Sequence, residues 1–375
     1  MRLGRVAGVS VGAHWSTLLV LALFATMLAT IELPATAPGY PTVVYWVAAV
    51  VLAGVFLASI LAHELAHAAV ARHHGVAVDS ITLWLLGGIA QLHEHARDPE
   101  AELRIALAGP ATSFAIGAAS GVLAVAVYSV GGPGLVVAAL GWLATVSTLL
   151  AVFNLIPGAP LDGGRVLTAL LWRRSGDERA ARRRSARIGQ VLGQVMIGIG
   201  IFQMLVGVGI GGLWFVLLGW FLMAAARGEE AQLELTAALD GVRVADVMTP
   251  RPVVVGRGTT VADFVAHKTL HTRGSSFPIV DGHGQVTGLV TFRRVRAVPH
   301  GRWETTPVDD VALPVDELWT AAPDEKLLDV LARGPGGDGR IVVLDGGHVV
   351  GIVSPTDVTQ AVQRFGLHAD LSRGG

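Results

Sequence analysis

Two histidines and a glutamate lie close together at the end of a long apolar segment. Residues 59–75 read SILAHELAHAAVARHHG, and almost every residue from Val43 to His63 is apolar. Positions four apart share a helix face, so the imidazoles of His63 and His67 can bind one metal ion. Glu64 is their neighbour and can take a proton from a water molecule that the metal activates. The pattern H-E-x-x-H therefore indicates a zinc site with a general base.

The depth of this cluster in the apolar segment supports a function. Ionisable groups within a membrane span are costly and mark functional sites by default. His63 comes nine residues before Arg72, which is about 14 Å along a helix that rises about 1.5 Å per residue. The alternative is a helix at the membrane interface whose polar end carries these residues without function, and the depth of the cluster disfavours it.

The sequence NLIPGAPLDGGR at 154–165 offers a third metal ligand. Pro157 and Pro160 cannot continue a helix, and unwound backbone at membrane depth is tolerated only where it lines a cavity or is buried in protein. Asp162 would complete a His₂Asp site with the fourth position open to water. Asn154 can donate a hydrogen bond to a developing oxyanion. Taken alone, the stretch is equally consistent with a turn between a span and a loop.

The composition is that of a chain that lies largely in lipid. Of the 375 residues, 52% are hydrophobic and 15% are charged, whereas about a quarter are charged in soluble domains. The net charge of −1 gives no sign of nucleic-acid binding, and without cysteine only His, Asp and Glu can hold a metal. Apolar runs of about 20 residues predict membrane spans. Six are expected, at 12–31, 43–71, 105–130, 135–156 and in the two halves of 188–226, which a turn at 207–212 divides.

Arginines in the short loops orient these spans. The segment 172–187 holds seven arginines and is expected in the cytoplasm, whereas the loops 32–42 and 131–134 hold none and are expected outside. Both termini are then cytoplasmic. The apolar run from Val6 to Ile31 is interpreted as a span, because it is longer than the apolar part of a signal peptide and no strong cleavage site follows it.

From about Leu239 the composition changes to that of a soluble domain. Charged residues and prolines return over roughly 130 residues, which is close to the usual size of one domain. The segments 244–295 and 318–358 form an internal repeat. Each copy has a short helix, a strand that ends in Asp-Gly, a second strand and the start of another helix. The sequence therefore predicts a polytopic α-helical membrane protein followed by a cytoplasmic α/β domain.

Four motifs follow one another within residues 1–228. They are HELAH, LWLLGGIA with its pair of glycines (83–90), ALAGPATS (106–113) and NLIPGAPLDGGR. In this order they resemble the site-2 protease family of intramembrane zinc metalloproteases. The resemblance implies a six-span membrane domain with the second, third and fourth spans as its core. The implied substrate is a single-pass membrane protein, cut within the lipid bilayer of a prokaryotic cell membrane.

The resemblance also implies the roles of particular residues. It assigns one zinc ion per chain to His63, His67 and Asp162, the general base to Glu64, and assistance at the oxyanion to Asn154. Residues near 78–92 are expected to form an extended, partly membrane-inserted segment. Its edge would bind an unwound substrate by strand addition, because a helical substrate hides its carbonyl groups.

The cytoplasmic repeat resembles a tandem of CBS (cystathionine-β-synthase) domains. The expected parts are a linker at 229–242, a first copy at 243–298 and a second copy at 308–366. Members of that family often bind adenine nucleotides such as ATP or AMP between the two copies, and the pair can also form a homodimer. The alternative is a purely structural module that dimerises or docks on the membrane domain.

The second copy carries the stretch that resembles the family's ribose-binding signature, GIVSPTD at 351–357. Ser354 and Asp357 would be its polar groups, since an aspartate can accept hydrogen bonds from ribose hydroxyls. The first copy departs from the signature because Arg294 stands where the aspartate would fall. This argues against a second adenosine site, although Arg293 or Arg294 can contact phosphates.

The leading hypothesis is a zinc-dependent endopeptidase that cuts transmembrane segments and is regulated by a nucleotide. The alternative is an ion transporter or channel regulated by the CBS pair, since broken helices with polar groups also form transporter sites. A transporter has no need of Glu64 beside two histidines. Bound zinc, and loss of activity with a chelator, would distinguish the two.

Overall fold

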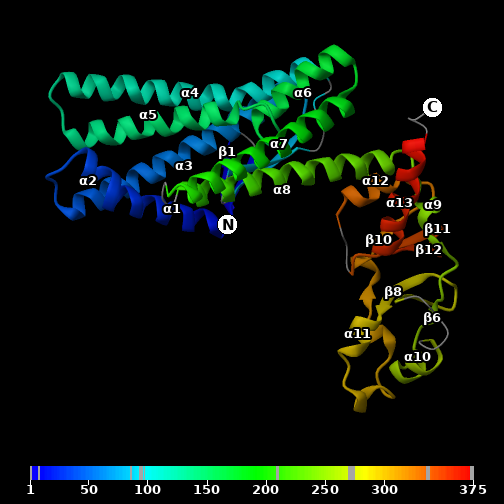
Figure 1. Cartoon of the computed structure of the whole chain (residues 1–375). Coiled ribbons are helices and arrows are strands. Elements are labelled where there is room, and N and C mark those ends of the chain that lie inside the picture. Colours follow the sequence, from blue (N-terminus) through cyan, green and yellow to red (C-terminus); the bar gives the residue numbers. More distant parts are fainter. Residues whose placement is uncertain are drawn as a thin grey trace. The chain divides into compact units, whose positions relative to one another are not determined.

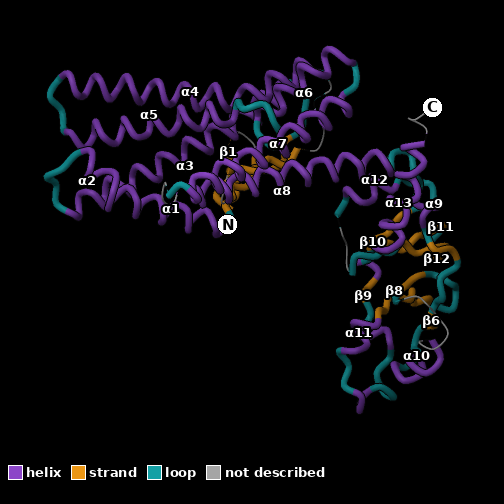
Figure 2. The backbone as a smooth tube through the Cα atoms, in the orientation of Figure 1, coloured by secondary structure: helices purple, strands orange, loops and turns teal. Residues whose placement is uncertain are grey.

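The computed structural model describes residues 2–6, 9–84, 87–92, 96, 98–207, 211–268, 275–334 and 338–371. The chain divides into two compact units, Met1–Ala231 and Gln232–Gly375. The first unit consists of long helices with one small sheet, and the second mixes short helices and strands (Figures 1 and 2).

Within the described residues, six helical segments are long and apolar enough to cross a membrane, which confirms the predicted polytopic fold. The first segment joins α1 (Trp15–Met27), a π-helical turn (Leu28–Glu32) and α2 (Leu33–Thr36). The others are α3 (Thr42–His73), α4 (Pro99–Ser129), α5 (Gly134–Asn154), α7 (Glu178–Leu205) and α8 (Gly211–Ala238). The turn expected at 207–212 contains residues 208–210, which lie outside the described residues.

The first predicted span begins too early. Its first residues belong to strand β2 (Val9–Ala13), and α1 begins only at Trp15. β2 pairs with β1 (Arg2–Val6) on one side and in parallel with β3 (Val78–Trp84) on the other, and β4 (Gly87–Leu92) completes the sheet. Val11 is 2% exposed and lies opposite the fully buried Ile81. The strand escapes prediction because its short alternation merges with the apolar run that follows it.

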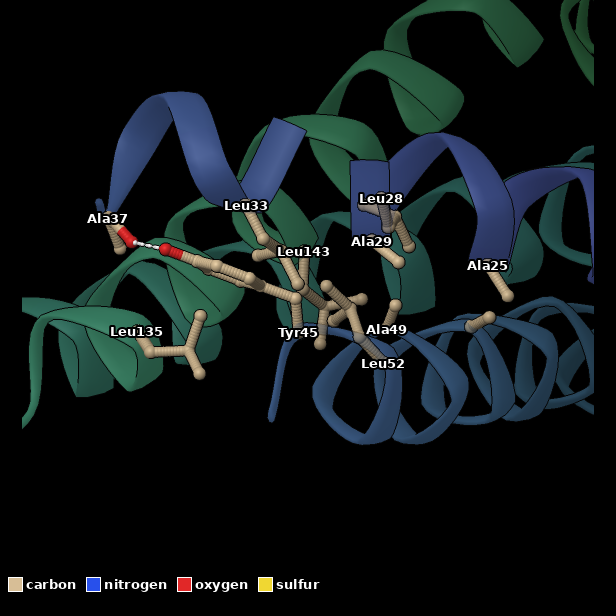
Figure 3. Close-up of a cluster of buried hydrophobic side chains, with 11 residues drawn as sticks. Ala25, Leu28, Ala29, Leu33, Ala37, Tyr45, Ala49, Leu52, Leu135 and Leu143 are labelled. Carbon is tan, nitrogen blue, oxygen red and sulfur yellow. Dashed lines mark hydrogen bonds between the residues drawn. The ribbon is translucent and has the colours of Figure 1, made fainter. Parts of the chain in front are cut away.

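A buried apolar cluster holds the first span against α3 (Figure 3). The N–H of Leu33 donates to the carbonyl of Leu28, five residues earlier, and this π-helical bond places both leucines on one face. Both side chains are 0% exposed. The Tyr45 hydroxyl donates to the carbonyl of Ala37 at 2.7 Å, so its one polar group is satisfied within the cluster.

The second unit contains both copies of the predicted repeat. The first copy comprises β6 (Val255–Gly256), α10 (Val261–Lys268), β7 (Ser276–Val280), β8 (Val286–Thr291) and α11 (Phe292–Arg296). The second comprises β10 (Trp319–Ala321), α12 (Leu327–Ala332), β11 (Ile341–Asp345), β12 (His348–Val353) and α13 (Pro355–Leu371). Shorter pieces lie before β6, namely α9 (Val244–Val247) and β5 (Thr249–Pro250). Others lie between α11 and β10, namely β9 (Leu313–Pro314) and 3₁₀ turns at His300–Arg302, Val308–Val311 and Val315–Glu317.

The two copies exchange strands. β5 lies before β6 of the first copy but pairs with β12 of the second, and β9 lies before β10 of the second copy but pairs with β8 of the first. The sheets therefore have the orders β10-β11-β12-β5 and β6-β7-β8-β9. Leu289, Leu313, Val342 and Ile352, which come from both sheets, form one buried cluster. The exchange and this cluster bind the copies into a single folding unit.

Helices α7 and α8 meet backbone to backbone. A Cβ on Gly193 would lie 2.6 Å from the carbonyl oxygen of Gly219, and a Cβ on Gly200 would lie 2.5 Å from that of Gly212. Small residues at such contacts let membrane helices approach closely enough for extensive van der Waals contact.

Replacing Gly200 with leucine should separate α7 from α8 and destabilise the membrane unit by about 1–3 kcal/mol, the usual cost of overpacking. Gly198 on the same helix is the matched control, since a Cβ there meets nothing within 4 Å. Thermal unfolding in detergent measures both variants. Equal melting temperatures for Gly200→Leu and Gly198→Leu would contradict the close contact.

Candidate metal centre

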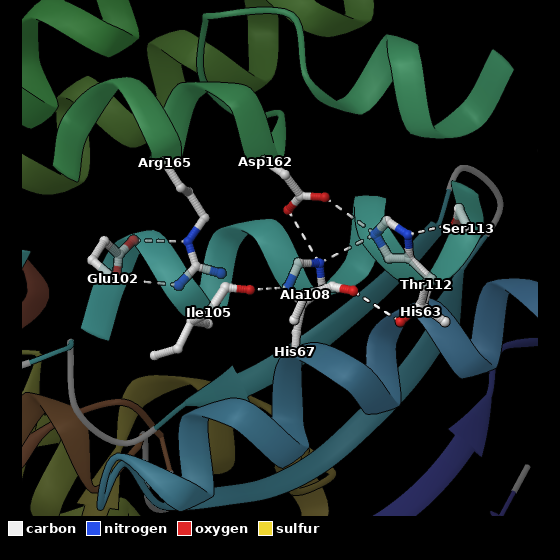
Figure 4. Close-up of polar contacts among 9 residues, drawn as sticks. All are labelled: His63, His67, Glu102, Ile105, Ala108, Thr112, Ser113, Asp162 and Arg165. Atoms are coloured by element: carbon white, nitrogen blue, oxygen red, sulfur yellow. Dashed lines mark hydrogen bonds and ion pairs between the residues drawn. The ribbon is translucent and has the colours of Figure 1, made fainter. Parts of the chain in front are cut away.

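The side chains of His63, His67 and Asp162 converge in the first unit, although 99 residues separate the first from the last (Figure 4). Nε2 of His63 lies 3.1 Å from Oδ2 of Asp162, and Nε2 of His67 lies 3.3 Å from Oδ1. The two Nε2 atoms are 3.2 Å apart. Both histidines come from α3 and are 5% and 7% exposed, and Asp162 is the first residue of α6 (Asp162–Ser175).

Hydrogen bonds fix which nitrogen of each ring faces the carboxylate. Nδ1 of His67 lies 2.7 Å from the carbonyl oxygen of Ile105, and a carbonyl can only accept, so Nδ1 carries the proton and Nε2 has a free lone pair. Ser113 Oγ lies 2.9 Å from Nδ1 of His63, where it accepts the ring N–H when Nε2 binds a metal. Such partners orient histidine ligands and raise their basicity.

The arrangement of the three donors fits zinc. Ligands about 2.0–2.1 Å from a tetrahedral zinc ion lie about 3.3 Å from one another. The contacts observed here are of this size: the two Nε2 atoms lie 3.2 Å apart, and they lie 3.1 and 3.3 Å from different oxygens of Asp162. Two imidazole nitrogens and a carboxylate oxygen also form a donor set that zinc accepts, with a fourth position left for water.

A glycine on α4 provides the room for the ion. A Cβ on Gly109 would overlap Nε2 of His67 and would lie 2.5 Å from Nε2 of His63. Any side chain at this position would therefore occupy the space between the two donors. The sequence contained the signal in the ALAGPATS motif, but nothing local showed that the glycine faces the histidines.

The two glycines that follow Asp162 allow the first turn of α6 to pack closely against the segment that precedes it. Cβ atoms on Gly163 and Gly164 would overlap the backbone of the irregular segment 155–161, which joins α5 to α6. The segment therefore folds back on the first turn of α6 and presents Asp162 to α3. This is the unwound backbone that Pro157 and Pro160 predicted.

The remaining predicted catalytic residues lie on the same helices. Glu64 follows His63 on α3 and is half-buried, and Asn154 is the last residue of α5 and is also half-buried. Asn154 directly precedes the irregular segment that leads to Asp162. Their roles in the reaction stay predictions.

An ion pair that the sequence did not predict lies beside the metal centre. Nε and Nη2 of Arg165 donate to the two oxygens of Glu102, at 2.9 and 3.3 Å. The Glu102 side chain is 2% exposed. Burial alone would lower the pKa of Arg165, but the neighbouring Glu102 carboxylate outweighs it and raises this pKa, so the guanidinium is charged.

In the second unit, Ser354 and Asp357 lie together at the start of α13. The backbone N–H and the hydroxyl of Ser354 both donate to Oδ2 of Asp357 at 2.7 Å. The backbone N–H of Asp357 donates back to Ser354 Oγ at 3.3 Å, which makes the pair a cap for the helix. The second carboxylate oxygen, Oδ1, lies 3.5 Å from the hydroxyl of Thr249.

In the first copy, the position that corresponds to Ser354 and Asp357 is occupied by a carboxylate of the protein itself. Asp338, whose side chain is 3% exposed, accepts a hydrogen bond from the Thr291 hydroxyl at 2.9 Å and pairs with Arg293 and Arg294. Thr291 and Arg294 stand where Ser354 and Asp357 stand in the second copy. Arg293 and Arg294, either of which can contact phosphates, pair here with a carboxylate of the second copy.

Gly109→Ala should abolish zinc binding, because the added methyl group takes the place between the two Nε2 atoms. Gly121→Ala on the same helix is the control, since its Cβ would make only an ordinary contact with Ala144 at 3.7 Å. Zinc content of the purified variants by atomic absorption tests this. A full zinc complement in Gly109→Ala would show that the metal lies elsewhere.

Comparison with known proteins supports the chemistry read from this site. The model of peptidase family M50 matches residues 51–133 and 118–199, and the model of the CBS domain matches residues 244–301. A protein of Mycobacterium tuberculosis (strain H37Rv) described as "Putative zinc metalloprotease Rip3" is 47% identical over 369 residues, which cover 97% of this chain and 93% of that protein.

Two further similarities come from Methanocaldococcus jannaschii. Zinc metalloprotease MJ0392 is 28% identical over 331 residues, which cover 88% of each protein. A solved structure of a site-2 protease from the same organism is 28% identical, with a TM-score of 0.42, and covers 61% of this chain and 94% of that one. The family match and the relatives confirm the zinc metalloprotease predicted from the sequence. The chain belongs to peptidase family M50, the site-2 protease family of membrane zinc metalloproteases.

Proposed function

We propose that this protein is an intramembrane endopeptidase that hydrolyses peptide bonds in the transmembrane segments of single-pass membrane proteins. One zinc ion per chain would be held by His63, His67 and Asp162. The observation that carries the proposal is the convergence of two buried imidazoles and a carboxylate on one point within a bundle of membrane helices.

Each residue around the metal centre has its own role in the proposed reaction. Zinc at this site supplies a Lewis acid and lowers the pKa of water. Glu64, which is adjacent to His63 on α3, takes the proton of the attacking water and gives it to the leaving amine nitrogen. The carboxamide of Asn154 donates a hydrogen bond to the developing oxyanion. Ser113 and the carbonyl of Ile105 keep the histidine rings oriented throughout.

The sheet offers a place for the substrate backbone. β4 lies at the end of the strand order β1-β2-β3-β4, so one of its edges has no partner among the described strands. An unwound substrate segment would add to this edge and expose its carbonyl groups for attack. Unwinding is required because a helical segment keeps those carbonyls in its own hydrogen bonds.

We place both termini in the cytoplasm of a prokaryotic cell, with the protease in the cell membrane. The arginines of 172–187 lie at the end of α6 and the start of α7, and the positive-inside rule puts them on the cytoplasmic side. The relatives from Mycobacterium tuberculosis and Methanocaldococcus jannaschii are prokaryotic proteins, which supports this location.

We propose that the CBS unit binds one adenine nucleotide, ATP or AMP, at Ser354 and Asp357, and that it regulates cleavage. The Oδ1 atom of Asp357 can still accept a hydrogen bond from a ribose hydroxyl. The first copy would bind none, because Asp338 already engages its polar groups. A homodimer through the same unit is also part of this proposal, on the resemblance to CBS pairs.

Glu64→Gln should lower the cleavage rate of a model single-pass substrate by about 10²–10⁴-fold, because the variant loses the general base. Zinc content should be unchanged, since Glu64 is no ligand in this proposal. The assay uses purified protein in proteoliposomes, with a chelator as a second way to stop the reaction. Full activity of the variant would remove Glu64 from the mechanism, and activity that survives loss of zinc would refute the proposed reaction.

Titration calorimetry of the full chain with AMP and with ATP should show one binding site per chain. Asp357→Asn should weaken binding at least about tenfold, because it removes a charge-assisted hydrogen bond to ribose. Thr291→Ala, which changes the first copy at the position that corresponds to Ser354, is the control and should leave the affinity unaltered. Two binding sites per chain would contradict the assignment of the nucleotide to Ser354 and Asp357. A loss of affinity in Thr291→Ala but not in Asp357→Asn would also contradict it.

A further inference from the structure

The ion pair between Arg165 and Glu102 joins the same two helices that shape the metal centre (Figure 4). Arg165 lies on α6, three residues after Asp162. Glu102 lies on α4, three residues before Ile105, whose carbonyl fixes the ring of His67. The pair is therefore one helical turn away from both contacts, because residues three apart lie on the same side of a helix.

The geometry of the pair restricts how α6 can move. Two parallel N–H···O bonds, at 2.9 and 3.3 Å, hold the planar guanidinium against the carboxylate and fix its orientation as well as its distance. Glu102 is almost fully buried, so its position follows that of α4. A rotation or slide of α6 relative to α4 would break at least one of the two bonds.

Another polar contact near Asp162 ties α6 to α7 and not to α4, because the hydroxyl of Ser185 donates to the carbonyl of Gly164 at 2.8 Å. The segment 155–161 folds back on the first turn of α6, where the backbone N–H of Gly164 donates to the carbonyl of Leu161 at 2.9 Å. The free side of Arg165 lines a cavity of about 100 Å³, together with Arg182 of α7 and Glu229 of α8. A second ion pair between α4 and α6, Arg173 with Glu100, is exposed and measures 3.8 Å, as expected of a weak surface contact.

We propose that Arg165 and Glu102 are positioning residues, which hold α6 against α4 so that the Asp162 carboxylate meets His63 and His67 at metal-binding distance. The inference rests on the proposed zinc site. The two residues do not touch the reacting atoms. They affect the reaction only by positioning Asp162. Replacing either of them should therefore lower the affinity for the metal first.

Zinc affinity, measured by chelator competition on the purified full-length protein, tests this role. Arg165→Met and Glu102→Gln should each weaken zinc binding by about 10–100-fold, the range found when partners of metal ligands are removed. The zinc affinity of Arg165→Lys should lie between that of wild type and that of Arg165→Met, because lysine keeps the charge but not the planar fork of donors. With saturating zinc, kcat should fall while KM stays unchanged.

Arg173→Met is the matched control, since it removes the other arginine that joins α6 to α4. It should leave zinc affinity as in wild type. Wild-type zinc affinity in Arg165→Met and Glu102→Gln would overturn the proposal, even if both variants melt at a lower temperature. If Arg165→Met does not fold, Glu102→Gln decides, because it keeps the size of the side chain but replaces one of the two acceptor oxygens with an NH₂ donor.

Asp162→Asn separates this inference from the function on which it rests. If Asp162→Asn weakens zinc binding but the Arg165 and Glu102 variants do not, only the positioning role is overturned. If Asp162→Asn binds zinc as wild type does, the proposed metal centre itself is wrong.

Discussion

The hydrocarbon core of a membrane offers no water to solvate polar groups, so a buried polar group without a partner in the protein is costly there. The metal centre meets this constraint atom by atom. Each imidazole has one nitrogen directed at Asp162 and the other at a fixed oxygen, either Ser113 Oγ or the carbonyl of Ile105. The positions of α3, α4 and α6 follow from the need to keep these contacts together.

Helix α4 organises the centre although no metal ligand is proposed on it. Glu102, Ile105, Gly109 and Ser113 recur at spacings of three, four and four, which places them on one stripe of the helix. Along this stripe α4 offers a partner for Arg165, an acceptor for His67, an empty space for the ion and an acceptor for His63. One helix face therefore sets the positions of the ligands that the neighbouring helices supply.

Local patterns explain how much of this could be predicted from the sequence. Helical periodicity alone paired His63 with His67, and Pro157 with Pro160 predicted broken backbone before Asp162. Apolar length predicted the spans, since lipid imposes the same requirement on every one of them. The roles of Gly109, of the pair formed by Glu102 and Arg165, and of Asp338 could not be predicted, because each depends on a residue far away in the chain. The strand exchange between the CBS copies could not be predicted either, because the paired strands are far apart in the chain.

The pairing of β2 with β3 has a consequence for biogenesis. Val11 leaves the ribosome before the first span, whereas its partner Ile81 follows only after the second. The sheet, in which β4 is last in the order of the described strands, therefore cannot form until two spans have been made. Asp162 emerges later still, after two more helices, so the nascent protein has neither a complete metal centre nor a substrate edge while its first spans enter the membrane.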